Sequence, residues 1–299
     1  MTEQKFPQIH QSHIETLLGC GERFKRLYLD GEKEPKTIPL LVGISSHRAI
    51  AADLNNKKDK GSLLCKGELQ DKAKDIFKEE IGSNEVMLQD GESKGKAQDQ
   101  TIDLVSAYHY DVAPIVQPIG IEEKFLLNLP EIKWSLAGTI DVNEEKALRD
   151  TKTTKINTGQ IVVDKSFQYT YYSYFRFRKS NNTFIPKIYQ DTVIKPTKTQ
   201  PARCITYSST RTQVDFICGI RRLLIAVEYI NAGIFIPAKT NDPLCDPRYC
   251  GFYKTCPYVN SERILSAYDH IKKSKEVKKP KEELLNGLLN SLKGEKQHV

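Results

Sequence analysis

Residues 134–154 read WSLAGTIDVNEEKALRDTKTT, and this stretch decides the fold. Two runs of β-forming residues flank the polar break Asn143-Glu144-Glu145, a pattern typical of two antiparallel strands joined by a short turn. Pairing the strands about that break places Asp141 opposite Asp150. Because side chains alternate along a strand, Asp150 and Lys152 share one face. The stretch therefore predicts a β-hairpin that gathers two carboxylates and a lysine.

These three side chains suit the chemistry of phosphodiester cleavage. Two carboxylates that face each other repel, and a divalent cation between them would compensate for the repulsion. Such an ion polarises a phosphate and lowers the pKa of a bound water, which Lys152 would orient. A solvated hairpin with exposed charges is the alternative explanation of this spacing taken alone. The pattern indicates a metal-dependent phosphodiesterase.

Further motifs lie on both sides of the hairpin. His47 follows Gly43-Ile44-Ser45-Ser46 and precedes a helix-like stretch over 48–54. Gln168 and Tyr172 are four residues apart in an aromatic helical segment, so they would lie on one side of it. Glu122 and Glu123 fall on the strand before the hairpin, where either could reach the site through water, but the pattern does not assign them to it.

The order His, G-x-x-D, D-x-K, Q-x-x-x-Y resembles the PD-(D/E)XK nuclease superfamily, specifically its RecB-like branch. The resemblance implies an α/β fold with a restriction-endonuclease-like core, in which helices flank a central mixed sheet. It implies a DNA exonuclease that acts on single-stranded or free ends in recombination, repair or phage DNA processing. A structure- or sequence-specific endonuclease and a non-catalytic nuclease-fold DNA-binding protein remain open.

The same resemblance implies a role for each motif residue. The metal, Mg²⁺ or Mn²⁺, would be bound by His47, Asp141, Asp150 and the main-chain carbonyl of Thr151. Lys152 would orient or activate the attacking water. Gln168 and Tyr172 would hold the DNA backbone or the geometry of the active site.

Four cysteines form a second pattern. Cys245, Cys250 and Cys256 cluster with Cys-x4-Cys-x5-Cys spacing, and Cys20 lies far upstream. The set resembles the 4Fe-4S staple of AddB-type and CRISPR-associated exonucleases. Thiolates also suit zinc, so zinc remains the alternative, and four unrelated thiols are the other. The odd total of seven cysteines argues against a disulfide framework and indicates a reducing compartment.

Composition limits the class of protein. The chain has 299 residues, 39% of them hydrophobic, and no apolar run approaches the roughly 18 residues that would span a membrane. We therefore expect a soluble protein, and the resemblance implies the cytoplasm of a bacterial or phage-infected cell. No G-x4-G-K-S/T motif occurs, so the chain carries no helicase motor of its own. The net charge of +7 is mild support for a nucleic-acid partner.

The expected organisation is one nuclease domain over 1–275, with a helical insert at about 48–116 and a C-terminal Cys-rich loop. From Lys272 onward eight lysines and four glutamates give +4, and 276–299 form a basic tail with an amphipathic helix. That tail is a candidate contact for a helicase or recombination partner. The pattern predicts helices at 14–28, 67–80, 101–116, 164–178, 212–232 and 261–271, strands at 119–127, 184–193 and 203–207 besides the hairpin, and a polar loop at 89–98.

Overall fold

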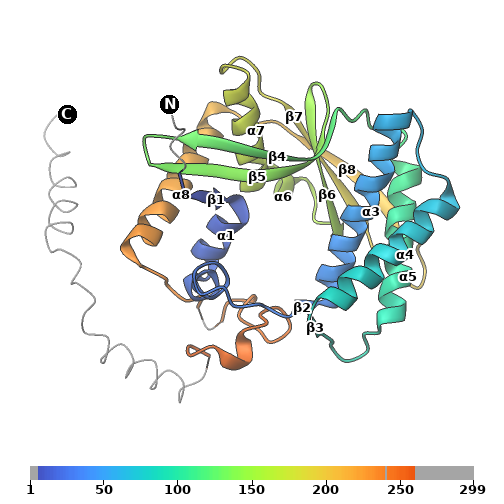
Figure 1. The fold of residues 1–299 in the computed structure, drawn as a ribbon, viewed down its shortest axis with the longest axis horizontal. Helices are drawn as coiled ribbons and strands as arrows, with labels where there is room; N and C mark the ends of the chain where they lie inside the picture. The colour runs from blue at the N-terminus through green and yellow to red at the C-terminus, as the bar shows by residue number, and fades with distance from the viewer. Residues whose placement is uncertain (1–5, 240, 260–299) are drawn as a thin grey trace, which may run out of the picture. The chain divides into compact units, whose positions relative to one another are not determined.

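The computed structural model describes residues 6–239 and 241–259, and the chain divides into two compact units, 1–238 and 239–299. The first unit contains the sheet and the long helices among these residues (Figure 1). The predicted helix at 261–271 and the leucine stripe of the tail lie outside the described residues.

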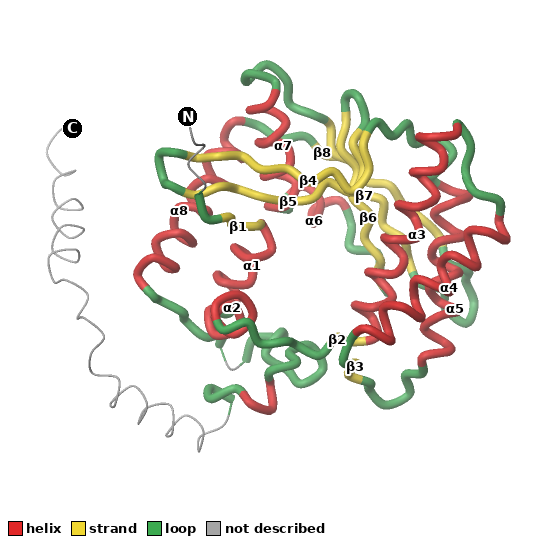
Figure 2. Tube along the Cα trace, viewed as in Figure 1, coloured by secondary structure: helices red, strands yellow, loops and turns green. Residues whose placement is uncertain are grey.

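A mixed sheet organises the first unit, as predicted, and it has six strands, of which the first, at Gln8–His10, was not predicted. The strand order is β1-β5-β6-β7-β8, and β4 pairs with the other edge of β5 (Figure 2). Pairing is parallel between β1 and β5 and between β6 and β7, and antiparallel elsewhere in this sheet. The strands are β1 (Gln8–His10), β4 (Gly120–Leu129), β5 (Trp134–Asn143), β6 (Ala147–Thr154), β7 (Lys187–Ile194) and β8 (Arg203–Ser209). Two short strands, β2 (Lys36–Thr37) and β3 (Val86–Met87), pair separately.

Helices cover both faces of the sheet. The helical insert on one face comprises α3 (Ile38–Lys60), α4 (Lys66–Ser83) and α5 (Lys94–Asp111), and the other face carries α1 (Gln11–Gly19), α7 (Phe167–Lys179) and α8 (Gln213–Ala232). Along β6, Leu148 packs in the core with α7 and α8. Its neighbour Arg149 points to the opposite side, where Asp191 of β7 and Tyr108 of α5 lie. Because side chains alternate along the strand, one face of β6 packs against α7 and α8 and the other face contacts β7 and α5 through polar groups.

The start of α3 corrects the prediction for His47. The helix begins at Ile38, so His47 lies inside it and not before it, and the helical insert starts about ten residues earlier than predicted. The Oγ1 of Thr37 accepts a hydrogen bond from the N–H of Leu40, and Pro39 occupies the first turn. These are helix-starting signals that the prediction overlooked.

Three further boundaries differ from the predictions. The helix expected at 14–28 is interrupted at Cys20, whose backbone is extended, before the short α2 (Gly21–Phe24) and a π-helical turn (Lys25–Leu29). Ser93 caps α5, so the loop expected at 89–98 ends earlier, and α5 itself ends at Asp111. The helix expected at 164–178 is split into α6 (Gln160–Asp164) and α7.

Backbone turns shape the described part of the second unit. The N–H of Cys245 donates to the carbonyl of Asp242 at 2.9 Å, and the N–H of Cys250 donates to the carbonyl of Asp246 at 2.9 Å. A 3-10 turn over Tyr253–Thr255 separates Cys250 from Cys256. The three cysteines therefore lie in an irregular loop, in agreement with the expected C-terminal Cys-rich loop.

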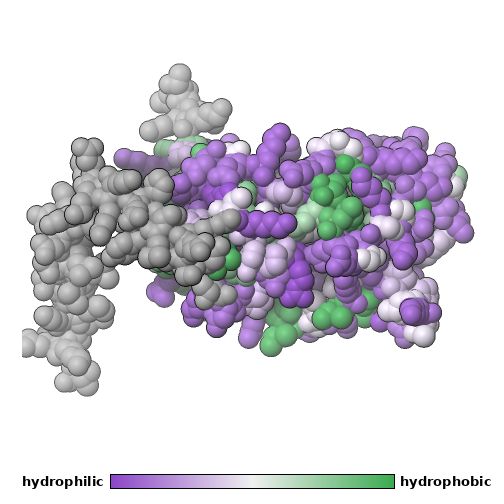
Figure 3. All heavy atoms as spheres, turned by 90° about the horizontal axis from the view of Figure 1, so that it is seen from below, coloured by the Kyte–Doolittle hydropathy of each residue, from purple (hydrophilic) through white to green (hydrophobic). Residues whose placement is uncertain are grey.

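Two surface properties bear on partners. Among the described residues, no helix has both the length and the apolar character needed to cross a membrane. The face in Figure 3 is mostly hydrophilic, and its apolar surface lies in separate patches.

Candidate active site

The site lies where β5 and β6 separate. One edge of β5 pairs with β1 over Ser135–Ala137 and with β6 at Val142 and Asn143, which leaves Gly138–Asp141 without a strand partner on that edge. The N–H of Thr151 instead donates to Asp141 Oδ2 at 3.0 Å. The carboxylate therefore takes the place of a ladder hydrogen bond and lies between the two diverging strands, a position that we call the fork.

Asp150 lies on the face of β6 that meets α7. It is buried, and its Oδ1 accepts a hydrogen bond from Gln168 Nε2 at 2.7 Å. Its Oδ2 lies 2.8 Å from Lys152 Nζ and 2.9 Å from the hydroxyl of Tyr169. Burial raises the pKa of Asp150 above its ordinary value, and Lys152 offsets only part of this effect.

Lys152 reaches solvent while it contacts the buried acid. Its side chain is 43% exposed. Burial alone would lower the pKa of Lys152, but Asp150 and Asp141 outweigh burial and raise the pKa above its ordinary value. Lys152 therefore remains a cation at neutral pH, able to donate hydrogen bonds and to stabilise negative charge but not to accept a proton.

A histidine and two carboxylates meet at the mouth of the fork. The ligand atoms of His47, Glu122 and Asp141 all lie within 4.8 Å of one another, and His47 Nδ1 is 3.2 Å from Asp141 Oδ2. They come from α3, β4 and β5. One imidazole nitrogen with two carboxylate oxygens is a donor set that suits a divalent cation. The residues present thus fit the metal that the hairpin predicted.

Electrostatic coupling within this group is strong. Burial would lower the pKa of His47, but Asp141 and Asp150 raise it above its ordinary value. Burial would raise the pKa of Asp141, but the hydrogen bond and charge of His47 bring it below its ordinary value. Burial, and then the charge of Asp141, raise the pKa of Glu122. A divalent cation would relieve the repulsion between the two carboxylates.

Glu122 also has a strained backbone. Its φ is 50°, in the left-handed region that side chains other than glycine rarely adopt. Such strain is commonly retained where it directs a functional group. Glu122 occupies the position of β4 opposite Asp141, since the flanking residues Ile121 and Glu123 pair with Val142 and Ile140.

The structure brings most of the predicted residues together. His47 and Asp141 lie in the three-residue group, whereas Asp150 lies beside it, with its oxygens contacting Lys152, Gln168 and Tyr169. Prediction missed Glu122 as a ligand, although counting the register of the β4–β5 hairpin would have placed it opposite Asp141. It also missed Tyr169, which no motif distinguishes from the other tyrosines of its helix.

Gln168 and Tyr172 meet, as their spacing on α7 predicts. Gln168 Nε2 donates to Asp150 Oδ1 and also to the Tyr172 hydroxyl at 2.8 Å. The Tyr172 ring lies edge-on to Phe125, with centroids 5.9 Å apart. Phe125 is paired with Gly138, where an added Cβ would lie 2.5 Å from the Phe125 ring. The glycine of the G-x-x-D motif therefore makes room for the ring that supports Tyr172.

Changing Gly138 to alanine is expected to destabilise the protein by about 1–3 kcal/mol and to slow cleavage. The new methyl group displaces the Phe125 ring, and the displacement reaches Gln168 through Tyr172. Thermal unfolding and DNA cleavage would both be measured. The matched control is Gly82→Ala in α4, where no atom lies within 4 Å of the added Cβ. Equal stability and equal cleavage in the two variants would contradict the packing argument.

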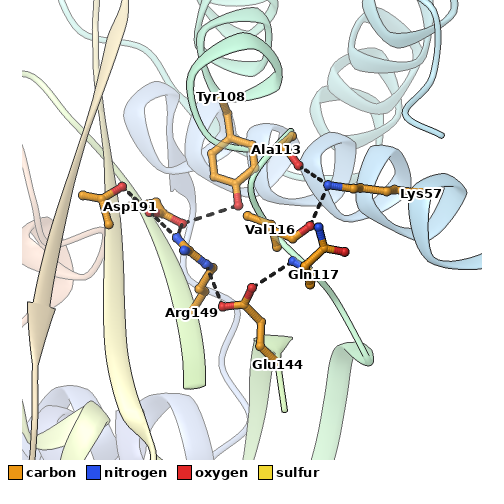
Figure 4. Close-up of polar contacts among 9 residues, drawn as sticks. Lys57, Tyr108, Ala113, Val116, Gln117, Glu144, Arg149 and Asp191 are labelled. Carbon is orange, nitrogen blue, oxygen red and sulfur yellow. Dashed lines mark hydrogen bonds and ion pairs between the residues drawn. The ribbon is translucent and has the colours of Figure 1, made fainter. Parts of the chain in front are cut away.

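A buried ionic network holds the opposite side of β6 (Figure 4). Arg149 Nη1 lies 2.9 and 3.0 Å from the two carboxylate oxygens of Asp191, and Arg149 Nε lies 3.0 Å from Glu144 Oε2. Burial raises the pKa of Asp191, and Arg149 opposes this rise. The Tyr108 hydroxyl of α5 lies 3.5 Å from Asp191 Oδ2. The network joins β6, which carries Asp150 and Lys152, to β7 and to the helical insert.

An open groove of about 780 Å³ leads to the fork. One wall is formed by α3, mostly by apolar residues such as Leu40, Ile44 and Ala51. Asp141 and Lys152 line the opposite side. A substrate in this groove would reach the acidic group directly.

The sequence pattern of the PD-(D/E)XK nuclease superfamily matches residues 8–257. The chain belongs to this superfamily. No curated protein matches the chain. One similar solved structure is that of SSO0001, with 13% identity, a TM-score of 0.37, and coverage of 84% of this chain and 97% of that one. This similarity is too low to bear on fold or function.

Membership implies a hydrolytic nuclease, with DNA as the substrate and a divalent metal as the cofactor. The acidic group at the fork is where the structure has residues for such a metal. The predicted superfamily is thus confirmed.

Proposed function

We propose that this chain is a Mg²⁺- or Mn²⁺-dependent deoxyribonuclease of the RecB-like branch that acts as an exonuclease at DNA ends. The processes it would serve are recombination, repair or phage DNA processing, in the cytoplasm of a bacterial or phage-infected cell. The observation that carries the proposal is the fork, where His47, Glu122 and Asp141 converge beside the ion pair of Asp150 and Lys152. A helicase or recombination protein as partner of the tail at 276–299 stays a prediction.

The residues at the fork divide into those that would hold the metal and those that support them. His47, Glu122 and Asp141 would hold it, with Asp150 and the main-chain carbonyl of Thr151 completing the set. The metal would polarise the scissile phosphate and lower the pKa of the attacking water.

Lys152 and α7 would act on the reacting groups and on Asp150. Lys152, as a cation, would orient the water and stabilise the negative charge that develops on the phosphate. Gln168 and Tyr169 hold the Asp150 carboxylate from two sides, and Tyr172 supports Gln168. Their expected role is to position Asp150.

The groove supports an end-directed substrate. Its α3 wall is mostly apolar, and Arg48, which also lines it, is engaged by Glu79 and Glu80 at 2.9 and 2.7 Å. Such a wall offers few phosphate contacts and suits the sugars and bases of a strand that has left the duplex. An endonuclease would use the same catalytic groups. The two activities therefore have to be distinguished by comparing DNA substrates with and without free ends.

The test is incubation of the anaerobically purified chain with DNA of different topology. End-labelled linear DNA and closed circles, single- and double-stranded, would be treated with Mg²⁺, Mn²⁺ or EDTA. Metal-dependent loss of linear DNA alone supports the exonuclease, and the labelled end gives its polarity. Nicking of circles would establish the endonuclease instead. No cleavage with either metal would leave a DNA-binding protein with a nuclease fold.

We further propose that Cys20, Cys245, Cys250 and Cys256 bind a 4Fe-4S cluster, with zinc as the alternative. The cluster would be structural, because hydrolysis of a phosphodiester needs no electron. Cys20 lies in the break between α1 and α2, and the N–H of Gly21 donates to the carbonyl of Ile236 at 2.6 Å. Eight residues lie between Ile236 and Cys245, so the segment that contacts Gly21 is close in sequence to the cysteine loop.

Changing Cys250 to alanine is expected to reduce soluble yield and bound iron before it affects cleavage per folded molecule, since the cluster would stabilise the fold. Iron and acid-labile sulfide per chain would be measured in protein purified without oxygen, together with zinc. Cys218→Ala, at an exposed cysteine of α8, is the matched control. A Cys250→Ala protein that is stable, fully active and unchanged in metal content would remove the cluster from the proposal.

A further inference from the structure

A second groove lies on the far side of Gln168. It has a volume of about 510 Å³ and runs between the start of α1 and the connection from α6 to α7. Gln168 lines it, and the same Gln168 amide donates to Asp150 Oδ1 at 2.7 Å. The groove that contains Asp141 and Lys152 and this second groove thus approach the catalytic carboxylates through different residues.

The second groove exposes apolar side chains from a firmly held segment. Ile161 and Val162 on α6 are 61% and 49% exposed, whereas the next residue, Val163, is fully buried. Arg211 Nη2 donates to the carbonyls of Val163 and Ser166 at 2.9 and 3.0 Å. Gln160 Nε2 on the other side donates to the carbonyl of Ser208 at 2.8 Å. Because contacts hold the chain on both sides of Ile161 and Val162, the exposure of these two residues is a property of the folded structure.

Positive charge lies around the same groove. Lys165 lines it and is exposed. Arg222 lies over the ring of Phe167, 4.1 Å from its centroid, and its Nε is buried without a hydrogen-bond partner. The acid at this groove, Glu15, lies 3.5 Å from Arg222. An unpaired nucleotide can place its base against aromatic or apolar side chains and its phosphate near cations, and this groove offers both.

We propose that this second groove, built around Ile161, Val162 and Phe167, binds an unpaired nucleotide of the DNA strand next to the scissile phosphate. The inference rests on the proposed DNA substrate and adds a subsite to it. A duplex does not present the face of a base to the groove, so the subsite favours single-stranded over double-stranded DNA. The hydrogen bond from Gln168 to Asp150 connects the groove to the catalytic carboxylate, and this connection favours a nucleotide of the substrate over a protein as the occupant of the groove.

Binding of the full chain to fluorescent oligonucleotides in EDTA tests the subsite without cleavage. The double variant Ile161→Ser, Val162→Ser is expected to weaken binding of single-stranded DNA by about fivefold or more. A loss of about fivefold corresponds to the lower limit of the free energy that one base contact contributes. Binding of a blunt duplex should change much less. The control is Val214→Ser, Ile217→Ser, which removes two side chains of α8, 67% and 53% exposed, that do not line the groove.

Equal affinity of the groove variant and the control variant for single-stranded DNA would overturn the subsite. An equal loss for single-stranded and duplex DNA would also overturn it, because the contact would then be to the backbone. Cleavage of bis(p-nitrophenyl) phosphate with Mn²⁺ separates the subsite from catalysis, since this small diester does not extend into the groove. The groove variant should retain that activity. If the unaltered chain cleaves neither this diester nor DNA, the proposed catalytic function fails, and the binding comparison still decides the subsite.

Discussion

Replacing Lys152 with alanine is expected to slow DNA cleavage by at least about 100-fold, the effect of removing one preorganised donor from a developing charge. Lys152 contacts Asp150 at 2.8 Å, and the two acids at the fork keep it a cation. Its side chain is nearly half exposed, so little packing is lost. Initial rates on end-labelled DNA, at saturating metal, would be compared with the unaltered chain.

Lys155→Ala is the matched control, because Lys155 is an exposed lysine three residues further along the chain. It should cleave at the normal rate, and both variants should unfold at temperatures close to that of the unaltered protein. Lys152→Arg keeps the charge but not the compact ammonium, and is expected to recover only part of the rate. Normal cleavage by Lys152→Ala would remove this residue from the mechanism.

The largest expected loss of stability comes from Asp191→Ala. This change leaves Arg149 buried without its bidentate partner, which typically costs about 3–5 kcal/mol in the free energy of unfolding. Thr206 and Tyr108 also lose their contacts to Asp191. Urea denaturation followed by circular dichroism would measure the loss.

The exposed pair of Arg48 and Glu79 provides the comparison. Glu79→Ala should cost no more than about 1 kcal/mol, because solvent screens such a pair. Replacing Arg149 and Asp191 with apolar residues and Glu144 with Gln should restore much of the stability lost in Asp191→Ala, since none of the three charges of the network then remains. A loss in Asp191→Ala as small as that in Glu79→Ala would show that the network does not hold β6 in place.

Local patterns were sufficient for the hairpin and for the long helices α4 and α8. The two strands β5 and β6 begin and end within the predicted stretch 134–154, and α8 begins one residue after the predicted start. Predictions failed where caps and breaks decide the boundary, as at Thr37 before α3 and at the extended backbone of Cys20. Propensity summed over a segment does not detect one hydrogen bond at a helix end.

The sequence by itself determined the superfamily, the hairpin, and the alternation that directs Asp150 and Lys152 to one face of β6. It did so because strand periodicity and motif spacing are local properties of the chain. Only the tertiary structure decided that β5 and β6 diverge, that α3 brings His47 to Asp141, and that Glu122 joins them. These contacts join residues as many as 94 positions apart, from His47 to Asp141, and packing between elements decides them.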